Sequence, residues 1–422
     1  MIDRNIQPAV HPIQEVDFIK PEKFLLGNKI PFYILKAGSQ PVIRLEFFFK
    51  AGSKYQKKPL QASYTVSQLT EGTKSFSARQ IADRMDYFGA FLHGEVEDEY
   101  AVITLHCLSK NFKDVWPVLK EVLTCPVFPD SELNTALANG KQKLSVNLNK
   151  VEFVARREFS ASLFGNHPYG KKAELDYYSK LSTKDLKDYY NEFYKSENCE
   201  VMASGNFGND IQEILNNEFV LSEGKSVYPD FNFESIAASH KNIPKEGSVQ
   251  CGIRMGKVLF NRAHEDFIGM NVVNTLLGGY FGSRLMANIR EDKGYTYGIG
   301  SALASYPDTG VFLIATEVGA EVCKEALKEI YKEIELLRTE KVSDEELSLV
   351  KNYMLGSFLR NSDGPFAMSD RFKSIHFSGL DYSYYQKYIK KVNSITADEI
   401  LYLCIKYLDT KSFTEIVAGT QV

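Results

Sequence analysis

A cation and a phenol seven residues apart are the side chains of this sequence that could do chemistry together. Arg290 lies toward the end of a predicted helix and Tyr297 at the start of a predicted strand, so both can point into one crevice. Both side chains donate hydrogen bonds. Taken alone, an Arg near a helix C-terminus usually complements the helix dipole, and a Tyr on a strand usually belongs to the core. The pair therefore needs support from the rest of the chain.

A glycine-rich turn and a short helix must position this pair. The turn contains Gly278, Gly279 and Gly282, three glycines within five residues, which predicts a backbone free to adopt positive φ. A short amphipathic helix follows, Gly294 is predicted to end it, and residues 295–304 have the composition of a strand. The stretch therefore predicts a turn, a helix and a strand, with Arg290 near the end of the helix and Tyr297 near the start of the strand.

This order of features resembles the insulinase/pitrilysin family of zinc metallopeptidases, which includes the mitochondrial processing peptidases. In that family a glycine-rich turn, a helix carrying an Arg and a Tyr seven residues later mark the second of two homologous domains. The resemblance implies an α+β fold with two tandem domains. Each domain would be an antiparallel sheet covered by helices, and the two would face each other across a cleft.

An internal repeat supports two tandem domains. Residues 182–186 match residues 396–400 at an offset of 214 (396 − 182). Other residue pairs at this offset are Asp130 and Asp344, Arg157 and Arg371, and Gly205 and Gly419. We therefore expect a first α+β domain at 1–217, a linker at 218–245 with few periodic apolar positions, and a second α+β domain at 246–422 that carries the Arg/Tyr motif.

Individual elements of the first half are also predicted. The hydrophobic pattern indicates helices at 61–70 and 183–194, a hairpin at 91–108 and a strand at 199–204. Ser77 and Gln80 form the pattern of a capping box, which predicts that a helix begins there and runs to residue 87.

Composition restricts the class of protein. At 422 residues the chain is long enough for two domains of about 200 residues each, and 44% hydrophobic residues can supply their cores. A net charge of −4 without a long Lys/Arg run argues against nucleic acid as a partner. The sequence shows neither a secretory signal pattern nor an apolar run of the ~20 residues that span a bilayer. Six scattered cysteines indicate reduced, mostly buried thiols, so a cytoplasmic protein without membrane partners is expected.

The zinc motif of the family is missing from this chain. The family carries H-x-x-E-H on a helix before a Gly-Thr pair, and a distant Glu completes the zinc site. Gly72-Thr73 is present here, and the alignment then places Ser63 and Ser67 at the two His positions, Val66 at the general base and Lys143 at the distant Glu. Neutral serine hydroxyls do not hold zinc, Val66 cannot accept a proton, and Lys143 would repel the cation. We therefore expect no metal or other cofactor on this chain.

Two functions remain open. In the first, the chain is the non-catalytic subunit of a heteromeric zinc metalloendopeptidase, and a homologous partner bearing H-x-x-E-H holds the zinc. The resemblance then implies that Tyr297 stabilises the oxyanion formed on a peptide at the partner's zinc, and that Arg290 binds the peptide backbone or orients Tyr297. Gly278, Gly279 and Gly282 would let the backbone approach the extended substrate.

In the second, the chain is a catalytically inactive structural or peptide-binding protein of the same fold, either a homodimer or a core-type subunit of a larger complex. Arg290 would then form a buried ion pair, with Glu291 or Asp292 as partner, and Tyr297 would be a core residue. The two functions differ in whether a zinc-bearing chain faces the Arg/Tyr pair.

Overall fold

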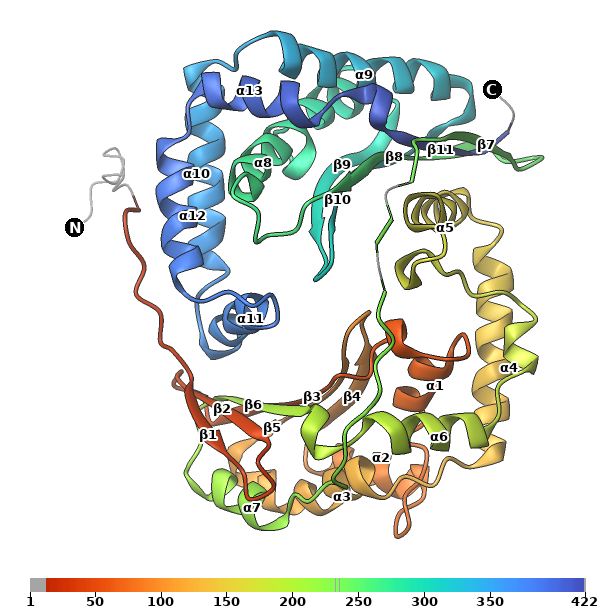
Figure 1. Cartoon of the computed structure of the whole chain (residues 1–422), viewed down its shortest axis with the longest axis vertical. Coiled ribbons are helices and arrows are strands. Elements are labelled where there is room, and N and C mark those ends of the chain that lie inside the picture. Colours follow the sequence, from red (N-terminus) through yellow and green to blue (C-terminus); the bar gives the residue numbers. More distant parts are fainter. Residues whose placement is uncertain (1–12, 232, 235, 421–422) are drawn as a thin grey trace. The chain divides into compact units, whose positions relative to one another are not determined.

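A computed structural model of the chain describes residues 13–231, 233–234 and 236–420 (Figure 1). Its contacts divide these residues into two compact units, which are described separately here. The first unit comprises the described residues of 19–255 together with 364–370 and 414–420. The second unit comprises residues 13–18, 256–363 and 371–413.

The first unit holds the six-stranded sheet of β1 to β6, part of the other sheet and most of the helices of the first half. Its strands are β1 Glu22–Leu25, β2 Pro31–Lys36, β3 Val42–Phe49, β4 Phe91–Val96, β5 Ala101–Leu108, β6 Cys199–Gly205, β7 His240–Pro244, β11 Thr414–Gly419 and the beginning of β8 Gln250–Leu259. Its helices are α1 Gln61–Ser67, α2 Ala78–Tyr87, α3 Phe112–Thr124, α4 Asp130–Asn147, α5 Val151–Phe164, α6 Thr183–Phe193, α7 Asp210–Glu218 and the beginning of α11 Pro365–His376.

The second unit holds the end of β8 and two long strands with their helices. The strands are β9 Thr296–Ser305 and β10 Gly310–Gly319. The helices are α8 Phe267–Asn274, the π-helices η6 Thr275–Gly279 and η7 Met286–Asp292, α9 Cys323–Thr339, α10 Asp344–Arg360, the end of α11, α12 Ser383–Ser394 and α13 Ala397–Tyr407. Among the described helices, none combines the length and apolar character that a membrane span requires.

The two sheets share one topology, which confirms the predicted α+β fold with two sheets. Their strand orders are β1-β2-β6-β3-β5-β4 and β7-β11-β8-β10-β9, and apart from the added β1 the second order repeats the first. The structure differs from the predicted antiparallel sheets in one pair each, because β2 pairs with β6 and β7 with β11 in parallel. A parallel pair requires a long crossover connection, and the intervening strands and helices of each half provide it. The expected cleft and the domain bounds at 217 and 246 stay predictions.

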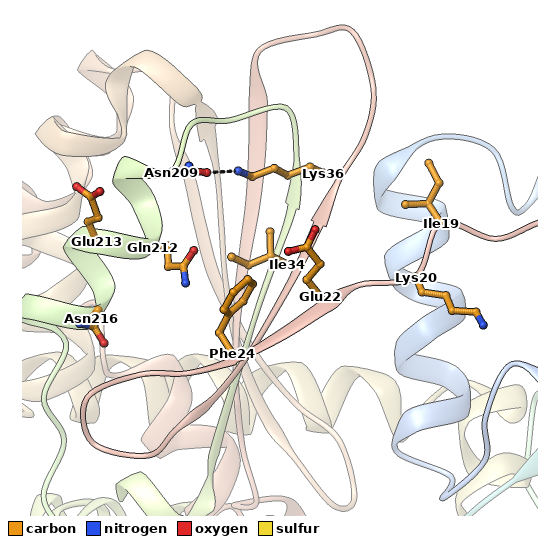
Figure 2. Close-up of a pocket in the computed structure, with 10 residues that line it drawn as sticks. All are labelled: Ile19, Lys20, Glu22, Phe24, Ile34, Lys36, Asn209, Gln212, Glu213 and Asn216. Atoms are coloured by element: carbon orange, nitrogen blue, oxygen red, sulfur yellow. Dashed lines mark hydrogen bonds between the residues drawn. The ribbon is translucent and has the colours of Figure 1, made fainter.

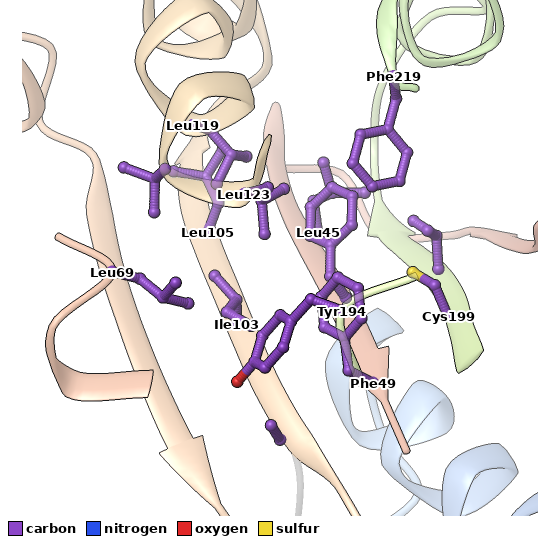
Figure 3. Packing of buried hydrophobic residues seen from close by; sticks show 14 of the residues in the cluster. Leu45, Phe49, Leu69, Ile103, Leu105, Leu119, Leu123, Tyr194, Cys199 and Phe219 are labelled. Atoms are coloured by element: carbon purple, nitrogen blue, oxygen red, sulfur yellow. The ribbon is translucent and has the colours of Figure 1, made fainter. Parts of the chain in front are cut away.

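Strand β3 shows why the first sheet forms where it does. Residues 43–49 of β3 are all buried, and Ile43, Leu45 and Phe49, which the period of two places on one face, are 0% exposed. Leu45 and Phe49 lie in the cluster that Leu119 and Leu123 of α3 also enter (Figure 3). Burial of each such side chain contributes roughly 1.5–3 kcal/mol. The helices on this face therefore hold the sheet in place.

The helix ends confirm the offset of 214 residues. Ser182 caps α6 in a capping box with Asp185, and Thr396 caps α13 by accepting a hydrogen bond from the backbone N–H of Glu399. The first residues of α4 and α10 also differ by 214, as do those of α5 and α11. The predicted capping box at Ser77, the hairpin and the strand at 199–204 are confirmed as well.

Candidate functional site

The helix that carries Arg290 is a π-helix that ends at a left-handed glycine. Helix η7 spans Met286–Asp292. Gly294 follows with a φ of +65°, and the backbone N–H of Tyr295 donates to the carbonyl of Ile289 at 3.0 Å. The predicted stop at Gly294 is therefore confirmed, since a residue with a side chain is strained at this φ. π-Helical turns are rare and concentrate at functional sites.

Tyr297 lies at a β-bulge. The register of β10 against β9 shifts between Thr316 and Val318. As a result, Tyr297 and Gly298 of β9 together lie opposite Glu317 alone. A bulge twists the strand and turns a side chain away from the regular pleat. This explains how a residue near the start of a long, half-buried strand keeps a side chain that is 94% exposed.

The structure brings Arg290 and Tyr297 together and adds Phe281 to them. The guanidinium carbon of Arg290 lies 4.6 Å from the ring centroid of Phe281 and 5.6 Å from that of Tyr297. Both distances are in the range of cation–π attraction, worth ~0.5–1 kcal/mol at exposed sites. We call these three residues the Arg290 stack. Phe281 is 62% exposed, and only its place inside the glycine-rich turn could have drawn attention to it.

The structural roles weighed for this pair are wrong. Tyr297 is not a core residue, because its side chain is almost fully exposed. Arg290 is half-buried, and within the part of the chain that the structure describes it forms no ion pair, with Glu291 and Asp292 or any other residue. The exposed rings of Phe281 and Tyr297 therefore lie at the surface of the second unit, and the half-buried guanidinium of Arg290 contacts both of them.

The three glycines of the turn provide room rather than positive φ. None of Gly278, Gly279 and Gly282 adopts a positive φ, so that expectation was wrong. Gly278 is buried, and a Cβ there would lie 2.5 Å from the backbone N of Ser301 in β9. Gly278 thus lets η6 approach β9, which is a packing role. Gly279 and Gly282 are exposed. A role of the three in substrate binding stays a prediction.

An ion pair and a ring pair fix the turn to α10. Both Nε and Nη2 of Arg284 donate to the carboxylate of Glu346, each at 2.8 Å. The hydrogen bonds and charge of Glu346 raise the pKa of Arg284 above its ordinary value. The rings of Tyr280 and Tyr353 lie 4.7 Å apart between centroids. This bidentate pair and ring contact hold the backbone on either side of Phe281.

Helix α1 and its surroundings do not fit a zinc ion. The hydroxyls of Ser63 and Ser67 donate to carbonyl oxygens three residues earlier, at 3.0 and 3.2 Å. Val66 is 3% exposed and lies against Gly94 of β4, while Lys143 is exposed on α4. Hydroxyl, alkyl and ammonium groups are not zinc ligands. No cluster of three or more His, Cys, Asp or Glu side chains suited to a metal ion occurs in the described residues.

Comparison with known proteins supports the family resemblance over the middle of the chain. Residues 180–354 match the family described as "Peptidase M16 inactive domain", and the match contains the glycine-rich turn and the Arg290 stack. The chain is related to the M16 peptidases. The resemblance to the insulinase-like family is thereby confirmed, and it is the inactive domain of this family that matches.

Relatives and solved structures agree with this assignment. A protein of Helicobacter pylori named non-peptidase homolog YmxG is 25% identical over 367 residues, 84% of this chain and 83% of the relative. YmxG of Bacillus subtilis, named an uncharacterized zinc protease, is 23% identical over 296 residues, 68% and 71% of the two chains. The crystal structure of a peptidase M16 inactive domain from Pseudomonas fluorescens matches with a TM-score of 0.87 at 22% identity, over 95% of this chain and 98% of that chain. The M16 fold is thus confirmed.

A pocket lies in the first unit of this M16 relative, between β1, β2 and α7 (Figure 2). This pocket of about 570 Å³ is lined by the amides of Asn209, Gln212 and Asn216 and by the ring of Phe24. The amine of Lys36 donates to Asn209 Oδ1 at 2.5 Å. The charged side chains Lys20, Glu22 and Glu213 also line it, so the pocket offers hydrogen bonds and charges of both signs to a ligand.

Proposed function

We propose that this M16 relative is the non-catalytic, substrate-binding subunit of a heterodimeric zinc metalloendopeptidase of the cytoplasm that acts on peptides or unfolded polypeptides. A homologous partner chain with an intact H-x-x-E-H motif carries the zinc. One observation carries the proposal. The phenol of Tyr297 is 94% exposed beside Arg290, on a chain whose α1 holds Ser63, Val66 and Ser67 where the zinc site would be.

The residues of the Arg290 stack have distinct parts in this function. Tyr297 donates its O–H to the oxyanion of the tetrahedral intermediate that forms when water attacks a peptide carbonyl. The partner's zinc supplies the activated water. Arg290, held over the ring of Phe281, donates to a carbonyl oxygen of the bound peptide. Because the β9 bulge and the end of η7 fix both donors before the substrate arrives, little reorganisation is needed in the transition state.

Peptide hydrolysis by the reconstituted pair tests the proposal. Tyr297→Phe keeps the ring and removes only the donor, so we expect kcat to fall ~10²–10³-fold with little change in KM. Tyr87→Phe is the matched control, because Tyr87 is 83% exposed in α2 of the first unit. If Tyr297→Phe and Tyr87→Phe retain the same kcat in a stable complex, the proposed role of the phenol is wrong.

The second candidate is a catalytically inactive peptide-binding or structural protein, a homodimer in the absence of a zinc-bearing partner. The name of the Helicobacter pylori relative, a non-peptidase homolog, favours it. In that case the chain purifies with itself only, and no H-x-x-E-H chain of similar size co-purifies. Light scattering of the isolated chain, followed by titration with a zinc-bearing homologue, separates the two candidates.

A further inference from the structure

A pocket inside the second unit contains two arginines and no acid. It has a volume of about 300 Å³ and is lined by residues of α8, the start of η6, α10, the end of α11 and α12, with one residue of β9. Arg262 and Arg371 are among its lining residues, and none of the described residues lining it is an Asp or Glu. The surroundings are mostly aromatic and polar side chains. The pocket is therefore cationic.

Neither arginine has a counter-ion. Arg262 donates from Nη1 to the carbonyl of Ser374 at 2.8 Å, and its buried Nε has no hydrogen-bond partner in the described chain. Arg371 donates to the hydroxyl of Ser362 at 3.3 Å and to the carbonyl of Phe358 at 3.4 Å, both neutral groups. No carboxylate of the described residues forms an ion pair with either guanidinium. The guanidinium of Arg371 also lies 4.7 Å from the ring centroid of Phe358, but such a contact does not neutralise its charge. Half-buried cations without a carboxylate partner are costly, so an anion that entered would be stabilised.

The internal repeat shows what this pocket lacks. At the offset of 214, Arg371 of the second half corresponds to Arg157 of the first. Arg157 pairs with Glu174, with Nη2 and Oε1 2.5 Å apart. The position that corresponds to Glu174 is 388 (174 + 214), and it is occupied by Tyr388. At this offset the second half thus keeps the arginine, whereas the position of Glu174, which lies between helices, falls on Tyr388 of α12, whose phenol lines the pocket.

The tyrosines of α12 supply further donors. Tyr384, Tyr385 and Tyr388 all line the pocket from this helix. Burial raises the pKa of Tyr388 to about 12, even though the charge of Arg371 acts to lower it. The pKa of Tyr384 is also raised by burial against the opposing charges of Arg262 and Arg371. The phenols of Tyr384 and Tyr388 therefore stay protonated at neutral pH and can donate to an anion, whereas the hydroxyl of Tyr385 already donates to the carbonyl of Arg371 at 2.7 Å.

We infer that this pocket binds an organic carboxylate of about amino-acid size, with Arg262 and Arg371 on the carboxylate and the rings of α10 and α12 around its apolar part. Guanidinium groups match the planar carboxylate, and ring faces suit an organic body better than a bare inorganic anion. A free small acid and the C-terminus of a peptide both present this group.

The pocket adjoins the Arg290 stack through one ring pair. Tyr353 lines the pocket from α10, and its ring lies 4.7 Å from that of Tyr280 in the glycine-rich turn. Thr275, where η6 begins, also lines it. A ligand in the pocket would thus contact η6, which runs into the glycine-rich turn, and Tyr353 of α10, which packs on Tyr280 of that turn. The inference stands without the proposed function, because it concerns binding by the isolated chain.

Calorimetric titration of the isolated chain tests this inference. N-acetyl-phenylalanine should bind at least ~10-fold more tightly than its C-terminal amide, which has the same body without the charge. A pentapeptide ending in phenylalanine distinguishes the sources: equal affinity with a free C-terminus indicates a peptide end, and loss of binding indicates a free small acid. Equal affinity for acid and amide, no binding of either, or tighter binding of inorganic phosphate would each overturn the inference.

Variants test the residues. Tyr388→Glu introduces a carboxylate that should pair with Arg371 and so weaken binding of N-acetyl-phenylalanine at least ~10-fold. Tyr388→Phe leaves the positive charge of the pocket unchanged and should retain most of the affinity. Circular dichroism checks that each variant folds. Should Tyr388→Glu fail to fold, Arg371→Gln removes the same charge without adding one. If the folded Tyr388→Glu or Arg371→Gln variant binds N-acetyl-phenylalanine as tightly as the unaltered chain, the assignment is contradicted.

Discussion

Gly278→Ala tests whether the glycine-rich turn is held by its approach to β9. The added Cβ would lie 2.5 Å from the backbone N and 2.7 Å from the Oγ of Ser301. Ser301 belongs to β9, whose backbone is held in register by its pairing with β10 and cannot swing away as a side chain can, so overpacking should cost near the upper end of ~1–3 kcal/mol. Alanine recovers ~0.5–1 kcal/mol through its helical preference. The net loss is about 2 kcal/mol, which lowers the melting temperature of a unit of this size by ~4–8 °C.

A glycine in open space provides the matched control. Gly356 is exposed inside α10 of the same unit, and no atom lies within 4 Å of a Cβ placed there. Gly356→Ala should therefore raise stability by ~0.5–1 kcal/mol. Scanning calorimetry is the suitable assay, because Trp116, the single tryptophan, lies in the first unit and its fluorescence does not report on this region. A melting temperature of Gly278→Ala equal to that of Gly356→Ala would refute the packing argument.

Two further predictions concern the buried groups of the first unit and the thiols. Tyr194 is buried, and its hydroxyl has no hydrogen-bond partner in the described residues. Tyr194→Phe should therefore raise the unfolding free energy by about 1 kcal/mol, measured by urea titration followed by Trp116 fluorescence. A loss of stability would contradict this. All six cysteines are free and only Cys125 is partly exposed, while burial raises the pKa of Cys107 and Cys404 to about 12. A disulfide reagent at pH 8 should therefore modify one thiol quickly in the native protein, and Cys125→Ser should abolish that phase.

Much of the fold could be predicted because its signals are local or repeated. The capping boxes at Ser77 and Ser182 mark helix starts by residues three positions apart, and the structure contains both. The offset of 214 predicted two copies of one unit, and the matching strand orders agree with it. The parallel pairs β2–β6 and β7–β11 could not be predicted, since strand neighbours far apart in the sequence are chosen by tertiary packing.

The candidate site was predictable in its residues but not in its geometry. Arg290 and Tyr297 follow from the family motif, and the stop at Gly294 from helix-ending chemistry. The bulge at Tyr297 and the ring of Phe281 against Arg290 depend on register and on packing across the turn, which no local pattern encodes. The φ values of the three turn glycines were wrongly predicted because their contacts with β9 and neighbouring side chains, rather than local backbone preference, require the small residue.

The place of β11 has a consequence for how the protein is made. This last strand lies between β7 and β8 in the sheet, yet it begins 155 residues after β8 ends (414 − 259). At ~5–20 residues per second a ribosome needs about 8–31 s to reach it. Throughout that time β7 lacks its neighbour and β8 has an open edge, and such edges invite pairing with other chains. A nascent chain that is stalled or truncated before Thr414 therefore exposes unpaired strand edges that β11 covers in the folded chain. We expect chaperones to bind such a chain.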